Sequence, residues 1–93
     1  MEFKAALFER WLMQRISGQT DSDGALLRVG DVIRQKRKAL NFSQEAFADE
    51  VGIDRAHMGR IERGERNVTF LNLLRIARAL GTLPSNILTE ANL

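Results

Sequence analysis

A turn of only three residues, Gly52-Ile53-Asp54, lies between two short amphipathic segments in the middle of this chain. The segments Ser43–Val51 and Asp54–Arg63 each carry apolar residues at helical spacing. So short a connection predicts two helices that cross steeply instead of running side by side. The second helix then projects its N-terminal end outward, a geometry suited to entering a DNA major groove.

The rest of the central and C-terminal chain is also predicted to be helical, because no alternating apolar–polar run indicates a strand. Before the turn, one helix ends near Asn41 and has an apolar face of Val29, Val32, Ile33 and Leu40. After it, Thr69–Leu80 is predicted to be a helix that ends at Gly81, with core-facing residues Leu71, Leu74, Ile76 and Ala77. A last helix, Pro84–Ala91, begins with a proline. The expected fold class is all-α, a compact five-helix domain.

An additional amphipathic helix is predicted at the N-terminus, over Met1–Ile16. Its apolar face comprises Phe3, Leu7, Phe8, Trp11, Leu12 and Ile16. The polar stretch Ser17–Gly24, with a glycine near its start and another at its end, is expected to be a linker. We therefore divide the chain into residues 1–24, the N-terminal helix with its linker, and residues 25–93, the main domain.

Composition limits the possible classes of protein. Ninety-three residues make one small domain, and the net charge of +2 does not indicate a general polyanion-binding tail. Without cysteine there is no disulfide or thiolate chemistry. The acidic residues Glu2 and Glu9 argue against a signal peptide, and no apolar run approaches the ~20 residues of a membrane span. A cytoplasmic protein is expected.

Basic residues concentrate in two patches, Arg34-Lys36-Arg37-Lys38 and Arg55 to Arg66. Two such patches suit a phosphate backbone on either side of a groove.

Several motifs together resemble the XRE-type, or phage-repressor-like, helix-turn-helix family over about Leu27–Leu88. They are Ile33, Arg37, Phe42-Ser43-Gln44-Glu45, Phe47-Ala48, Gly52-Ile53, Ile61-Glu62-Arg63-Gly64 and Leu74…Ala77…Leu80-Gly81. The segment IERGERNVT is also similar to the controller proteins of restriction–modification systems. The resemblance implies a DNA-binding regulator. The Met1–Ile16 segment departs from the family's minimal pattern.

The outer face of the second central helix is the predicted reading surface. If Met58 and Ile61 face inward, that outer face consists of Arg55, Ala56, Gly59 and Arg60, with His57 at its margin. Arg55 can present two donors to a guanine, and Ala56 can lie against a thymine methyl. Glycine at position 59 would permit close approach to DNA. The alternative for Arg55 and Arg60 is that they are ordinary solvated charges.

Other contacts follow from the resemblance. In the family, the residue at Gln44 meets a phosphate through the helix N-terminus and can brace a side chain of the recognition helix; the alternative is that Gln44 only supports the cap. Ser43 is expected to cap the helix rather than to contact DNA bases. Family members contact the DNA backbone at the positions of Arg66, Asn67 and Thr69. Arg63 is a weaker candidate for such a contact.

Arg37 and Glu62 are assigned a structural role, because the family commonly pairs these positions in a partly buried ion pair. Such a pair is weak evidence for net stability, but removing one partner leaves an unpaired charge.

No catalytic or metal-binding constellation is evident in the sequence. His57 is the single histidine, and neither cysteine nor a carboxylate cluster accompanies it. We expect no enzyme activity and no cofactor.

A domain of this size is expected to bind an inverted-repeat operator on double-stranded DNA as a homodimer. The apolar residues Leu83, Ile87 and Leu88 are the predicted dimerisation surface. The Met1–Ile16 helix is expected to dock on the domain or extend the dimer, with RNA polymerase as another partner. The predicted function is a transcriptional regulator that acts on its own operon, as a restriction–modification controller or a phage or plasmid repressor. The alternative is an antitoxin that binds a toxin through its N-terminal helix.

Overall fold

The computed structural model of the protein describes residues 21–93, which form five helices and, within that range, no strand. The helices are α2 Ala25–Ala39, α3 Gln44–Val51, α4 Arg55–Glu62, α5 Phe70–Leu80 and α6 Pro84–Glu90. The all-α class and the five-helix domain are thus confirmed. The helix predicted for Met1–Ile16 lies outside the described residues.

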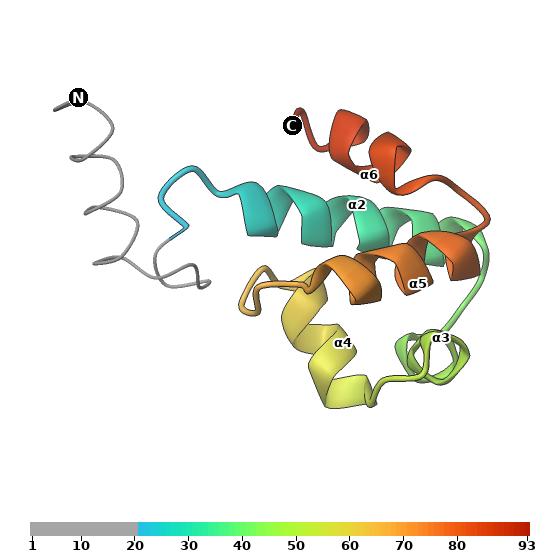
Figure 1. Ribbon diagram of the computed structural model, residues 1–93. Coiled ribbons are helices and arrows are strands. Elements are labelled where there is room, and N and C mark those ends of the chain that lie inside the picture. Colours follow the sequence, from blue (N-terminus) through green and yellow to red (C-terminus); the bar gives the residue numbers. More distant parts are fainter. Residues whose placement is uncertain (1–20) are drawn as a thin grey trace, which may run out of the picture.

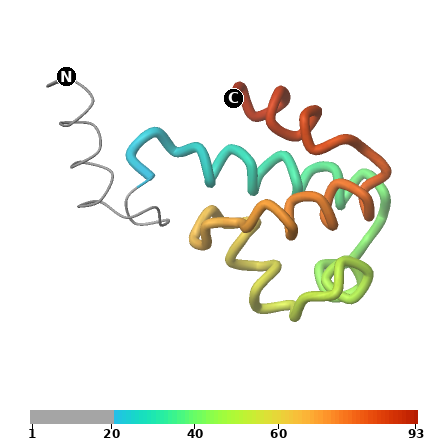
Figure 2. The backbone as a smooth tube through the Cα atoms, in the orientation of Figure 1, coloured from blue at the N-terminus to red at the C-terminus, as the bar shows by residue number. Residues whose placement is uncertain are grey.

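Helices α2 and α5 lie side by side through the middle of the domain (Figure 1). The α3–α4 pair packs on one side of these two helices, and α6 covers them on the other side (Figure 2). The C-terminal end of α6 returns along α2, where Lys36 Nζ and Glu90 Oε2 form an ion pair of 2.7 Å. No helix within residues 21–93 is both long and apolar enough to cross a lipid bilayer.

Every described helix contributes to one hydrophobic core. Its largest fully buried side chains are Ile33, Phe47, Met58, Ile61, Ile76 and Ile87. The smaller or slightly less buried members are Val29, Ala48, Val51, Leu73, Ala77, Leu80 and Ala91. Burial of this apolar surface is the main force that holds five short helices together, since none of them is long enough to be stable alone.

Side-chain caps begin three of the helices at the predicted residues. Ser43 Oγ accepts the Ala46 amide at 3.0 Å, and Thr69 Oγ1 accepts the Asn72 amide at 3.1 Å. Asp54 caps α4 in the same way. Each such cap contributes about 1 kcal/mol and fixes the first turn of its helix.

The start of α2 is capped by a residue that the sequence indicated only as part of a linker. The carboxylate of Asp21 accepts the amides of Ala25 at 3.0 Å and Leu26 at 2.8 Å. Gly24, directly before the helix, has a left-handed backbone that turns the chain back toward these amides. The last residues of the predicted linker therefore belong to the helical domain.

The turn between α3 and α4 has the predicted steep geometry. Gly52 has a φ of 90°, which only glycine adopts without strain, and its amide donates to Ala48 O at 2.8 Å. The amide of Ile53 donates to the same carbonyl at 3.0 Å, and its side chain packs against the core. This is a Schellman end for α3. It redirects the chain within three residues and points α4 away from α3.

Two expectations about the helix faces are wrong. Leu40 is 50% exposed because it follows the last residue of α2, and the buried position one turn earlier is taken by Arg37. Leu71 is 63% exposed, whereas Leu73 is buried. The buried stripe of α5 runs Leu73, Ile76, Ala77, Leu80. That spacing puts Leu71 on the opposite face and leaves Leu74 half-buried.

Helices α2 and α4 approach so closely at Gly30 that no side chain fits between them. A Cβ on Gly30 would lie 2.4 Å from Ile61 O and 2.6 Å from Glu62 O, both backbone atoms at the end of α4. Backbone atoms cannot swing aside as the end of a flexible side chain can. Glycine at this position therefore fixes the distance between α2 and the last turn of α4.

Gly30→Ala tests this close contact because helix propensity and overpacking change the free energy of unfolding in opposite directions. Helix propensity alone would stabilise α2 by about 0.5–1 kcal/mol. We expect instead a net loss of about 2 kcal/mol or more in the free energy of unfolding, from overpacking against backbone. Urea denaturation monitored by circular dichroism measures this change in the free energy of unfolding.

Gly52→Ala is the matched control, because a Cβ there meets nothing within 4 Å and introduces only the strain of a positive φ. A Gly30→Ala variant as stable as the parent protein would contradict the close approach of α2 and α4.

Candidate DNA interface

The face of α4 that points away from the core carries the predicted reading residues. Arg55, Ala56 and Arg60 are exposed, and His57 is half-buried at the margin. Met58 and Ile61 on the opposite face are buried, as the apolar spacing predicted. The structure thus presents two guanidinium groups and a methyl group along one outward side of α4, beginning at its first turn.

Gly59 is placed differently from the expectation. It is buried, not open on the outer face. A Cβ at this position would lie 3.0 Å from Arg63 Nη1 and 3.4 Å from Gln44 Oε1. The side chains of Gln44 and Arg63 therefore cover the middle of α4. The small size of Gly59 makes room for these two side chains, and close approach of DNA to its backbone stays a prediction.

Gln44 bridges α3 and α4. Its Nε2 donates to Glu62 Oε1 at 3.1 Å, so the amide group is oriented toward the end of α4. Ser43, just before it, is exposed and has its hydroxyl oxygen engaged in the α3 cap. Gln44 is thus the side chain that connects the N-terminal end of α3, a favourable position for a phosphate, with the end of α4.

Arg37 and Glu62 meet in a buried ion pair. Arg37 Nε donates to Glu62 Oε2 at 2.7 Å, and Nη2 donates to Oε1 at 3.1 Å. The remaining edge of the guanidinium donates from Nη1 to Phe42 O at 2.8 Å. The two side chains are only 8% and 2% exposed. Both ends of the pair are satisfied by several hydrogen bonds, which is the condition for keeping such charges in a domain interior.

The segment between α4 and α5 carries the other predicted backbone contacts. Arg66 and Thr69 are exposed, while Asn67 is half-buried and has an interaction partner. The Oγ1 of Thr69 caps α5. These residues therefore line the N-terminal end of α5, next to the last turn of α4.

Arg63 and Glu65 form an exposed, two-pronged ion pair in the same segment. Arg63 Nε donates to Glu65 Oε2 at 2.8 Å and Nη2 donates to Oε1 at 3.3 Å. The hydrogen bond and charge of Arg63 lower the pKa of the Glu65 carboxyl, and donating that hydrogen bond to Glu65 raises the pKa of Arg63. Arg63 was only a weak candidate in the sequence, yet the structure holds its guanidinium in a defined place.

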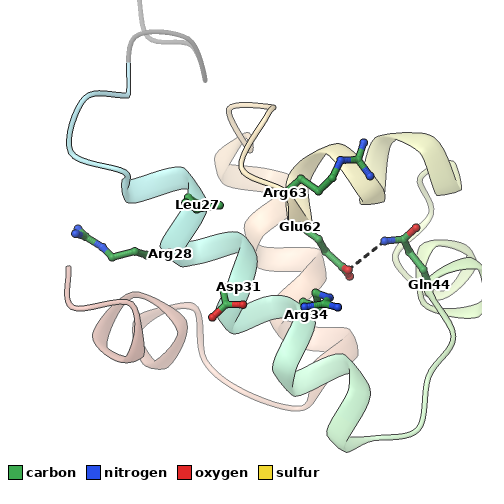
Figure 3. Close-up of a pocket in the computed structure, with 7 residues that line it drawn as sticks. All are labelled: Leu27, Arg28, Asp31, Arg34, Gln44, Glu62 and Arg63. Atoms are coloured by element: carbon green, nitrogen blue, oxygen red, sulfur yellow. Dashed lines mark hydrogen bonds between the residues drawn. The ribbon is translucent and has the colours of Figure 1, made fainter.

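A groove of about 680 Å³ lies between α2 and the ends of α3 and α4 (Figure 3). It is lined by Leu27, Arg28, Asp31 and Arg34 from α2, by Gln44 from α3, and by Glu62 and Arg63 at the end of α4. The sequence did not predict it, because the lining comes from separate helices. The sequence singled out Arg34 in a basic patch and Gln44, Glu62 and Arg63 through the family resemblance, but it did not place them around one groove.

The predicted dimerisation residues are placed in three different environments. Leu83 is 62% exposed, and Leu88 is partly buried against the core. Ile87 is fully buried in the core of its own domain, so its role as a surface contact is a wrong expectation. The side of α6 that carries Ile87 therefore packs within the monomer.

Comparison with known proteins supports the geometry. A family model described as helix-turn-helix matches residues 33–87. The chain belongs to the XRE-type helix-turn-helix family. It is 41% identical over 77 residues to the control protein C.SmaI of Serratia marcescens, covering 78% of this chain and 92% of that protein. The family consists of DNA-binding transcription regulators and is not a class of enzymes.

Two solved structures share the fold at substantial identity. The restriction–modification controller protein C.AhdI of Aeromonas hydrophila is 40% identical with a TM-score of 0.65, covering 67% of this chain and 94% of that one. The P22 c2 repressor, solved in complex with a synthetic operator, is 32% identical with a TM-score of 0.63 and the same coverage. The fold predicted from the motifs is therefore shared with both controller and repressor proteins.

Removal of one member of the buried ion pair should destabilise the domain more than removal of both. We expect Glu62→Ala to lower the free energy of unfolding by about 3–5 kcal/mol, since Arg37 is left buried without its partner. Arg37→Met combined with Glu62→Leu should recover much of that loss. A double-mutant cycle, with each free energy of unfolding measured by urea denaturation, gives the coupling energy of the pair. Additive losses for the two single variants would contradict a direct coupling between these side chains.

Proposed function

We propose that the protein is a sequence-specific regulator of transcription that binds an inverted-repeat operator on double-stranded DNA as a homodimer. The observation that carries this proposal is the outward face of α4, where Arg55, Ala56 and Arg60 are exposed from the first turn onward. The N-terminal end of a second helix presented by a tight turn is the element that enters the major groove in helix-turn-helix proteins.

Each exposed residue has a suitable role in such a complex. The planar guanidinium of Arg55 can donate two hydrogen bonds to one guanine, a contact that contributes about 1–3 kcal/mol of discrimination. Ala56 is small enough to lie against a thymine methyl group, and Arg60 stands one turn further along the helix. His57 flanks this row. Gln44, oriented by Glu62, is proposed to hold a phosphate beside the α3 N-terminus.

The opposite backbone strand is proposed to lie along the segment between α4 and α5. Arg66, Asn67 and Thr69 are the contacts we assign there, and Ser43 completes the set mainly through the α3 cap. Phosphate contacts of this kind position the protein but carry little sequence information. Specificity in the proposed complex therefore depends on the α4 side chains.

The relatives favour a particular biological setting. C.SmaI is named a control protein, C.AhdI is a restriction–modification controller, and the P22 c2 protein is a repressor. We infer that this chain acts in the cytoplasm as a controller or phage-type repressor that regulates its own operon. Contacts of the Met1–Ile16 segment with RNA polymerase or a toxin stay predictions, because that segment lies outside the described residues.

Substitution of a base-reading arginine should change which operator is preferred. We expect selection of bound sequences from random duplexes to return an inverted repeat with half-sites about one helical turn apart. Arg55→Ala should relax the preference at one symmetric position and lower affinity about tenfold or more for the original site.

Arg75→Ala is the matched control, because Arg75 is an exposed arginine on α5 outside the proposed interface. If Arg55→Ala instead weakens binding to all sequences equally, Arg55 is a phosphate contact. No enriched sequence with the parent protein would refute the proposed function.

The dimer is proposed to form on the exposed side of α6, around Leu83. Leu83→Glu should lower the dimer association constant by tenfold or more, because a charge would be buried in an apolar interface. The free energy of unfolding of the monomer should change little, since Leu83 is 62% exposed in it. Sedimentation equilibrium and urea denaturation measure the two effects. An unchanged association constant would exclude this side of α6 as the interface.

A further inference from the structure

Exposed apolar side chains gather at the end of the domain where the chain enters α2. Leu27, in the first turn of α2, is 58% exposed, and Phe70, the first residue of α5, is 70% exposed. The first turns of these two helices lie at the same end of the domain (Figure 1). Gly64, in the segment that leads to α5, lies against α2, since a Cβ on it would be 2.6 Å from Leu27 Cα.

This end continues the hydrophobic core but is left uncovered by the described residues. Leu26 lies on the stripe of α2 that buries Val29 and Ile33, yet Leu26 itself is only half-buried. On α5, Phe70 lies one turn before the buried Leu73 and is mostly exposed. The apolar stripes of both helices thus run past their last buried residue and reach the surface at the same end.

The start of α5 adds two more leucines to this surface. Leu74 is half-buried and lies one turn after both Phe70 and Leu71, so these three side chains are neighbours on the helix. Leu71 is 63% exposed. We call the set of five residues the apolar end; it consists of Leu26, Leu27, Phe70, Leu71 and Leu74. Leu83, assigned to the proposed dimer, follows the opposite end of α5.

The N-terminal part of the chain joins the domain at the apolar end. The carboxylate of Asp21 accepts the amides of Ala25 and Leu26, which places Asp21 beside the first turn of α2. Only residues 17–20 separate Asp21 from Ile16, and even a fully extended chain of that length spans at most about 18 Å. So short a connection gives the preceding segment a high effective concentration at the apolar end of its own domain.

The sequence of that segment supplies the apolar surface that would cover this end. Its side chains at helical spacing on one side are Phe3, Leu7, Phe8, Trp11, Leu12 and Ile16. Aromatic side chains bury a large apolar area for each residue, and three of these six are aromatic.

We propose that Met1–Ile16 packs its apolar face on the apolar end of its own domain and completes the hydrophobic core there. The sequence allowed two roles for this segment, docking on the domain or extension of the dimer, and the position of the apolar end favours docking. The inference does not depend on DNA binding. Thr69, which is assigned to the DNA backbone, directly precedes Phe70, so the docked segment would border the proposed interface.

Tryptophan fluorescence of the full chain tests the proposal. Trp11 is the single tryptophan, and the chain has no tyrosine, so the emission reports on this segment. In the folded parent protein, Trp11 should emit at shorter wavelength than in urea and should be less accessible to acrylamide. Phe70→Glu should shift the emission to longer wavelength and lower the equilibrium constant for docking about tenfold or more, because a charge replaces an apolar contact.

The substitution is chosen so that it does not weaken the domain itself. A glutamate in the first turn of α5 interacts favourably with the helix dipole, and that turn holds no other acidic residue. Leu27→Glu repeats the test from the first turn of α2, for the same reason. Leu40→Glu is the matched control, because Leu40 is 50% exposed and follows the opposite end of α2. Circular dichroism checks that all three variants keep their helices.

Dilution of the parent protein shows which chain supplies the segment. Emission that stays constant while sedimentation shows the dimer dissociating supports docking within one chain. Emission that shifts to longer wavelength as the dimer dissociates would assign the segment to the partner protomer and overturn the proposal.

Two further results would overturn it. One is that Trp11 in the folded parent protein is as accessible to acrylamide as in urea, which would leave the segment free for another protein. The other is that Phe70→Glu and Leu27→Glu shift the emission no more than Leu40→Glu does, which would place the segment elsewhere on the domain.

Discussion

The buried pair of Arg37 and Glu62 is the interaction on which the geometry of this domain depends. Arg37 comes from α2 and Glu62 is the last residue of α4, and through Phe42 O the same guanidinium also holds the chain that leads into α3. Gln44 then adds α3 to the network through Glu62. One carboxylate and one guanidinium thus connect three helices, and each group has several partners. The angle at which α4 projects is set by this network together with the apolar core.

The network also determines what reaches the surface. Glu62 is 4% exposed, so its charge contributes little repulsion toward a polyanion once Arg37 neutralises it. Its remaining effect is to orient Gln44 at the start of α3. A structural ion pair and a proposed DNA contact are therefore linked through one hydrogen bond. Variants at Glu62 should disturb both properties, whereas a variant at exposed Arg55 should change only the proposed DNA binding and leave the fold intact.

The features that were predicted correctly from the sequence are those that depend only on a residue and its neighbours along the chain. The caps at Ser43, Asp54 and Thr69 and the turn at Gly52 depend on a few neighbouring residues, so the helix boundaries followed from the sequence. The buried side of α4 followed in the same way from its apolar spacing.

Features that depend on contacts between helices could not be predicted from local pattern. Gly30 and Gly59 both appear in the sequence as weak helix formers, but the structure shows one excluding a side chain against the α4 backbone and the other making room for Gln44 and Arg63. The distinction between Ile87 in the core and Leu83 on the surface also needs the position of α6. The groove is built from α2, α3 and α4, so the sequence could name Arg34, Gln44, Glu62 and Arg63 but could not bring them together.

The position of Ile87 has a consequence for how dimerisation and folding are related. Because Ile87 and Ala91 fasten α6 to the core, the outward side around Leu83 exists as a surface only when the domain is folded. A homodimer on that side would stabilise the folded state by mass action, so that stability, dimerisation and operator binding rise together with protein concentration. A small domain with a single core has little stability to spare, which makes this coupling effective. Such a concentration-dependent response would suit the proposed control of its own operon.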